Sequence, residues 1–152
     1  LLQNQTSFCV VYLPPEISIT PTPLRMEMFR SIGVTRAFKN EKHFWHEWAI
    51  VDSRACLYFF QYLNFFRLGK EKHQHAVMDN MMHMVRSHLH IPNMEAELNL
   101  LGYCFLIVSQ LRNAFIWFSK SLKICPHYNA AKFYMAILFR KANIVRLTRS
   151  RQ

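Results

Sequence analysis

The stretch that decides the fold is residues 95–126, which read EAELNLLGYCFLIVSQLRNAFIWFSKSLKICP. The spacing of its apolar residues indicates two helices. Pro126 ends the second one, because proline lacks an N–H and clashes with the preceding turn. Gly102 and Ala114 lack bulk where two antiparallel helices must approach closely, and bulky aromatic residues nearby would fill the space beside them. The stretch therefore predicts a helical hairpin.

This hairpin resembles the tetratricopeptide repeat, whose signature W-x2-L-G-x2-Y, A-x3-F and P extends over about 34 residues. The residues that match the signature outright are Leu101, Gly102, Ala114, Phe118 and Pro126. Phe105 is aromatic where Tyr is usual, Ser121 is small where Ala is usual, and Leu98 matches Trp weakly. The alternative is an ordinary helical hairpin with a chance similarity, and the number of positions in register favours the repeat.

A second, looser hairpin is expected before this one, at about 54–91. Leu68-Gly69 matches the Leu-Gly pair that often closes the first helix of such a repeat. Gln61 and Tyr62 replace the Leu-Gly pair in the middle of that helix, which departs from the family pattern.

A final or capping helix is expected after Pro126, at 129–147, where Met135, Ala136 and Phe139 take the Leu, Gly and Tyr positions of the signature. The resemblance thus implies an all-α fold, an α-solenoid of about two and a half stacked hairpins within residues 23–152.

The N-terminal part of the chain differs from the rest. Residues 1–22 form an extended, Pro-rich arm by composition, with a short apolar run that favours extended structure. Thr22-Pro23 is expected to start a short helix that Gly33 ends. A further helix is expected from Asn40 through Val51, with a break at the cap residues Asp52-Ser53. Because the chain starts at Leu1 and ends in a basic helical segment, we expect it to be part of a longer chain or complex.

Composition narrows the classes of function. The chain has 19 Lys and Arg against 9 Asp and Glu, a net charge of +10, which favours acidic partners, nucleic acid or an anionic membrane surface. Only 3 glycines occur, which suits helices and leaves no Gly-rich phosphate loop. No apolar run approaches the roughly 20 residues of a transmembrane segment. The four cysteines form no C-x-x-C motif, and the three that lie in apolar helical runs are expected as buried thiols in a reducing, cytoplasmic setting.

Candidate chemistry is sparse. His43 and His46 stand in the order H-F-W-H-E, which does not match the H-E-x-x-H zinc motif, so no metal is expected. We expect no catalytic residues, no enzyme activity and no cofactor. The Met-rich stretch 78–84 has two interpretations, which are an adaptable binding surface and filling of gaps in a degenerate repeat.

The resemblance implies a concave groove lined by set positions of each first helix. Carried over to this chain, the residues expected to bind a partner are Phe59, Leu63, Phe66, Asn99, Tyr103, Leu106, Phe133, Ile137 and Arg140. The Lys and Asn clamp by which some members hold chaperone tails is absent. The predicted function is therefore a protein–protein interaction scaffold that binds an apolar, amphipathic or acidic segment of a protein partner. The alternative is an RNA-binding helical repeat that uses basic and aromatic residues. The N-terminal arm could also fill the groove.

Overall fold

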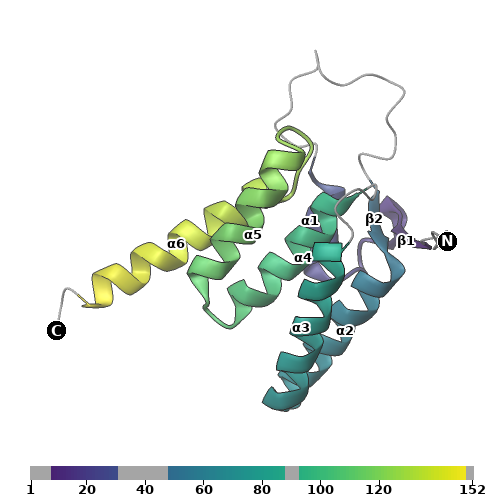
Figure 1. Cartoon of the computed structure of the whole chain (residues 1–152). Coiled ribbons are helices and arrows are strands. Elements are labelled where there is room, and N and C mark those ends of the chain that lie inside the picture. The colour runs from purple at the N-terminus through teal and green to yellow at the C-terminus, as the bar shows by residue number, and fades with distance from the viewer. Residues whose placement is uncertain (1–7, 31–47, 88–92, 150–152) are drawn as a thin grey trace.

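Helices dominate the computed structural model, which describes residues 8–30, 48–87 and 93–149, with side chains described as far as residue 143 (Figure 1). The elements in chain order are β1 (Cys9–Tyr12), the 3-10 helix η1 (Pro14–Glu16), α1 (Thr22–Met28), β2 (Ala49–Asp52), α2 (Ser53–Arg67), α3 (Glu71–Ser87), α4 (Met94–Ile107), α5 (Leu111–Ile124) and α6 (Ala131–Arg149). The expectation of a mainly helical chain is confirmed.

Two helical hairpins, α2–α3 and α4–α5, share one turn geometry. Each turn has three residues, and the middle one is left-handed: Gly69 at φ 64° and Ser109 at φ 59°. The next residue then donates its N–H to a carbonyl five residues back, Lys70 to Phe65 and Gln110 to Phe105, both at 2.9 Å. This is a helix-ending arrangement that satisfies carbonyls left open at the helix C-terminus. The two hairpins are therefore built by the same local device.

Helix α4 lies at the centre of the described structure and contacts α2, α3, α5 and α6 (Figure 1). The Tyr62 hydroxyl of α2 donates to the Cys104 carbonyl at 2.9 Å, and Lys141 Nζ of α6 donates to the Leu106 carbonyl at 3.3 Å. Figure 1 shows α6 at the edge of the assembly, with its C-terminal part projecting beyond the other helices.

The central hairpin closes at the small residue that the sequence indicates. A Cβ on Gly102 would lie 2.6 Å from Phe118 Cε1, so the aromatic ring rests directly on the α4 backbone. The other face of the Phe118 ring stacks on Tyr134 of α6, with ring centroids 5.0 Å apart and planes at 10°. Apart from Pro126, which is exposed just after α5, the signature residues Leu101, Gly102, Phe105, Ala114 and Phe118 are all buried.

The N-terminal region corrects one expectation. Residues 49–52 form strand β2, where a helix from Asn40 through Val51 was expected. Residues 40–47 of that prediction, with His43 and His46, and the expected helix end at Gly33 lie outside the described residues. Strand β2 pairs antiparallel with β1, so that Val10 faces Val51. Ile50 and Val51 are β-branched and fit a paired strand, and the partner strand lies in the arm, far away in sequence. The predicted cap is confirmed, because Asp52 accepts a hydrogen bond from the Arg54 N–H at 2.8 Å.

The Met-rich stretch contributes mainly to the core. Met78, Met81 and Met84 of α3 are buried. Each is three residues from the next, so successive methionines are neighbours on the helix surface. Met82 is half-buried and packs against the same core. Of the two interpretations of this stretch, gap filling fits these positions better.

Candidate interaction surfaces

Much of the inner face of α4 is packed inside the chain, and α1 covers it at Asn99. Asn99 Nδ2 donates to Glu27 Oε1 of α1 at 2.8 Å, and the Tyr134 hydroxyl of α6 donates to the Pro23 carbonyl at 2.8 Å. Phe59, Asn99 and Leu106 are buried in the chain's own core. Their expected place on an accessible groove is therefore wrong. The segment that covers Asn99 is the short helix α1, through Glu27, and not the N-terminal arm of residues 1–22 that was considered as an occupant of the groove.

The other six residues expected in the groove divide into two groups. Leu63, Tyr103 and Phe133 are half-buried and pack against the core. The Tyr103 ring lies 6.2 Å from Phe59 and 5.9 Å from Tyr134, centroid to centroid, so its packing is internal. Exposed side chains are found at Phe66, Ile137 and Arg140. Of the predicted set, the structure thus leaves Ile137 and Arg140 on α6, and Phe66 on α2, exposed to a partner.

A buried polar network joins α1, α4, α5 and the start of α6. Asn99 Nδ2 also donates to Asn129 Oδ1 at 2.9 Å, and Asn129 Nδ2 donates to Ser121 Oγ at 2.9 Å. Ser121 Oγ in turn lies 2.9 Å from the Glu95 carbonyl, to which it donates. The sequence pattern placed Ser121 at a small-residue position and Asn99 in a groove, but it carried no signal that Asn129 or Glu27 would be buried.

Two carboxyl groups are buried with incomplete pairing. Burial raises the pKa of Glu27 to about 7, although Asn99 and Arg30 act to lower it; the Arg30 nitrogen is 3.9 Å away. Burial, and then repulsion from Asp52, raise the pKa of Glu97 to about 7, against the attraction of Arg54. Neither oxygen of the Glu97 carboxyl has a hydrogen-bond partner. Charging these groups in the folded state is therefore unfavourable.

These carboxyls predict that the fold loses stability as the pH rises. Below pH 4.5, the ordinary pKa of the side chain, the folded and unfolded chains both hold the protons. Between pH 4.5 and about 7 the folded chain holds more protons than the unfolded chain, so the free energy of unfolding falls with rising pH. Glu97→Gln removes one of the two groups and should stabilise the protein at pH 8 by about 1–3 kcal/mol, with little effect at pH 4.5.

Denaturant unfolding at pH 4.5 and pH 8 measures this difference. Asp79→Asn, at an exposed position in the middle of α3, is the matched control and should change stability equally little at both pH values. A Glu97→Gln variant that is less stable than the parent at pH 8 would show that the charged carboxylate has a stabilising partner.

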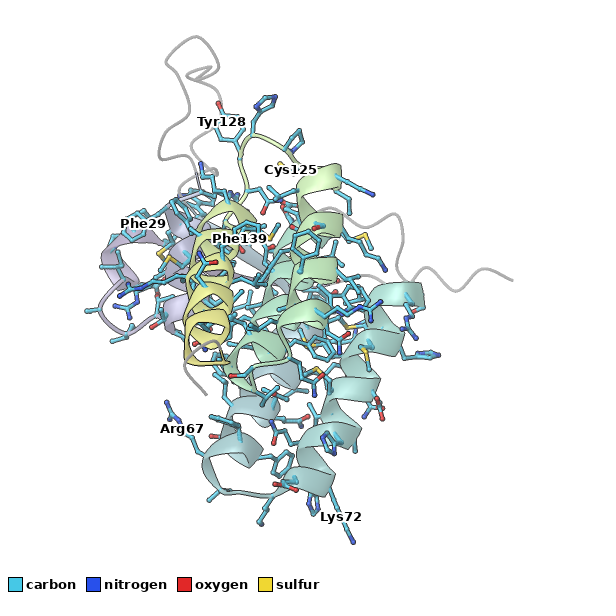
Figure 2. The ribbon with its side chains drawn as sticks, turned by 90° about the vertical axis from the view of Figure 1, so that its left-hand side faces the viewer. Phe29, Arg67, Lys72, Cys125, Tyr128 and Phe139 are labelled. Carbon is cyan, nitrogen blue, oxygen red and sulfur yellow. The ribbon has the colours of Figure 1, made fainter. Side chains whose placement is uncertain are left out.

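A different surface, formed by α5 and α6, exposes apolar side chains. Phe115 of α5 is 42% exposed and Phe139 of α6 is 52% exposed, and their rings meet edge to face with centroids 6.3 Å apart. Figure 2 looks onto α6 and labels Phe139 on it. Helical spacing places Ser119 beside Phe115, and Met135 and Ala136 beside Phe139. We name this set the open face; it consists of Phe115, Ser119, Met135, Ala136 and Phe139.

Net positive charge is concentrated in the C-terminal third of the chain, which contains this surface. Residues 98–152 contain nine Lys and Arg and no Asp or Glu, whereas residues 1–97 contain ten basic and nine acidic residues. Arg112 lies one turn from Phe115 on α5, and Arg140 follows Phe139 on α6; both are exposed. This asymmetry can be read from the sequence by dividing the chain after Glu97, whereas the total of +10 does not reveal it.

Within the described ranges, no group of three or more His, Cys, Asp or Glu side chains is arranged to hold a metal ion. None of the helices described is long and apolar enough to cross a membrane. Comparisons with models of protein families, with curated proteins and with solved structures gave no match. The chain's own surfaces are therefore the basis for a functional proposal.

Proposed function

We propose that this chain is a tetratricopeptide-like interaction module that binds an apolar or amphipathic segment of a protein partner. The repeat part of the proposal is supported by the common turn of the two hairpins and by the packing of Phe118 on Gly102. The single observation that carries the binding part is the exposed aromatic pair Phe115–Phe139. Exposed aromatic side chains that stand together are typical anchors of an interface.

The position of this pair in the fold also supports an interaction role. Phe105 of α4 is buried, whereas Phe139, at the corresponding position of α6, is half exposed. No second helix packs on that side of α6 among the residues described. A partner that covered Phe115 and Phe139 would remove their apolar surface from water, which is favourable by roughly 25 cal/mol per Å².

Phe139→Ala should weaken partner binding by about 2 kcal/mol, because truncating a central aromatic anchor typically costs this much. The partner is first identified by photocrosslinking from a benzophenone amino acid placed at position 139, with position 72 on α3 as the comparison site. Affinity is then measured with the purified partner. Leu57→Ala is the control, since Leu57 on α2 is 54% exposed, much like Phe139. Equal effects of the two substitutions would contradict the proposal.

RNA binding is the second candidate. It is favoured by the charge of residues 98–152, which include nine Lys and Arg and no Asp or Glu. A complex held by phosphate contacts loses affinity steeply with salt, on a slope set by the number of contacts. An apolar interface depends on salt only weakly. Crosslinking of RNA alone from position 139, together with a steep salt slope for a purified RNA, would replace the first candidate by the second.

A further inference from the structure

We infer that the open face takes an acidic amphipathic helix, which packs on α6 in the place where the second helix of a third hairpin would lie. The inference rests on the proposed function and adds the chemistry and the geometry of the partner segment. Three observations carry it. Helix α6 has two apolar stripes, Ala136 on the second stripe is exposed, and residues 98–152 carry a net positive charge.

Helix α6 carries more apolar surface than the rest of the chain uses. Ala131, Tyr134 and Leu138 are buried and form one narrow stripe against α5 and the core. Met135, Ala136 and Phe139 have the same three- and four-residue spacing and form a second stripe along the helix. Ala136 and Phe139 of this second stripe are exposed, whereas Met135 is half-buried and also packs against the core. A helix with two apolar stripes is suited to pack against elements on two sides.

The central hairpin shows which element covers this signature position. In α4 the small residue Gly102 is covered by Phe118 of α5, a bulky side chain seated on the helix backbone. Ala136 takes the same position in α6 and is exposed. A helix is the element that covers this position in the hairpin next to it. The occupant of the second stripe is therefore expected to be a helix that presents bulky apolar side chains to Ala136 and Phe139.

Charge selects among the possible helices. Arg112 and Arg140 flank the open face, and no acidic residue occurs anywhere in 98–152. A second copy of this chain would bring the same positive charge against itself, and like charges placed together across an interface disfavour binding. A helix with Asp or Glu beside its apolar stripe meets Arg112 and Arg140 with opposite charge. RNA would meet the charge as well, and its bases could stack on Phe115 and Phe139, so an RNA probe is included in the test.

The test uses two peptides that differ only in charge. The first has the sequence of residues 111–124, the helix that fills the corresponding place in the central hairpin. The second is identical except that Arg112, Lys120 and Lys123 are replaced by Glu. Binding of each to the full chain is measured at low and at physiological salt, together with a single-stranded RNA of about the same length. The acidic peptide should bind about tenfold more tightly than the basic one, because the basic peptide faces like charges.

Two variants of the chain locate the site. Phe139→Ala should weaken the acidic peptide about tenfold or more, and Arg140→Glu should reverse or abolish the preference for the acidic peptide. Both positions are exposed, so circular dichroism should show unchanged helicity.

The outcomes separate this inference from the proposed function. Equal binding of the two peptides, both weakened by Phe139→Ala, would overturn the acidic partner and leave the apolar interface intact. Binding of the RNA but neither peptide would overturn both. A dimer in sedimentation that Phe139→Ala dissociates would show that a second copy is the occupant. Absence of binding to any of the three probes, in a monomeric chain, would also contradict the inference.

Discussion

Asn129→Ala should lower the free energy of unfolding by about 3 kcal/mol, because it leaves several buried polar groups without partners at once. Asn129 Oδ1 accepts from the Ala131 N–H at 2.8 Å and from Asn99 Nδ2 at 2.9 Å, and Asn129 Nδ2 donates to Ser121 Oγ. Asn99, Ser121 and Ala131 are buried, so water cannot replace the lost bonds. Each unsatisfied buried group costs about 1–3 kcal/mol, and the network contains at least two.

The measurement is chemical denaturation of the variant beside Asn113→Ala. Asn113 also makes an amide hydrogen bond, to Gln110 Oε1 at 2.8 Å, but on the exposed side of α5. Its replacement should change stability by about 0.5 kcal/mol or less, as is usual for surface positions. If the two variants unfolded at the same denaturant concentration, the network around Asn129 would not be holding α4, α5 and α6 together.

Gly102→Leu should destabilise the protein by about 3 kcal/mol, at the upper end of what overpacking costs. Even a single Cβ at this position would meet the Phe118 ring at 2.6 Å. The ring has little room to retreat, because Tyr134 stacks on its other face. The higher helix propensity of Leu offsets only about 1 kcal/mol of this cost. Thermal and chemical denaturation of the variant measure the net loss.

A second substitution shows whether the loss comes from this contact. Phe118→Ala removes the ring, so the Gly102→Leu, Phe118→Ala double variant should be more stable than the two separate losses would give when added. Gly69→Ala serves as the contrast. Gly69 has no atom within 4 Å of an added Cβ but has φ +64°, so its replacement should cost stability in the same amount with or without Phe118. Simple additivity of Gly102→Leu and Phe118→Ala would contradict the close contact.

Local rules explain why the hairpins could be predicted. Side-chain size, helix caps and helix-ending residues act over a few neighbours, so that Gly102, Asp52 and Gly69 indicate their roles directly in the sequence. Helix α2 begins within a residue of the expected start of the first hairpin at about 54, and α5 ends two residues before Pro126, the residue expected to stop it. Ser109 is the exception. At the end of α4 it adopts the left-handed backbone conformation that usually calls for glycine, the residue found at the matching position 69.

The groove illustrates the opposite case. Tyr103 and Asn99 lie on the helix face that the resemblance assigned to a partner, and their periodicity is that of an accessible stripe. Asn99 is nevertheless bonded to Glu27, 72 residues earlier in the chain. Pairing between such distant segments depends on how the chain closes a long loop and on which polar groups meet. Neither is encoded in the spacing of residues 95–126.

By itself, the sequence determined two helical hairpins, a further helix after them, and a C-terminal third, residues 98–152, with nine Lys and Arg and no Asp or Glu. Those features follow from residue size, periodicity and composition, which are properties of neighbouring residues. Only the tertiary structure decided that β1 pairs with β2, that α1 covers Asn99, and that Phe139 stays exposed while Phe105 is buried. Burial is a property of the assembled fold: phenylalanine at the same signature position is core in α4 and surface in α6.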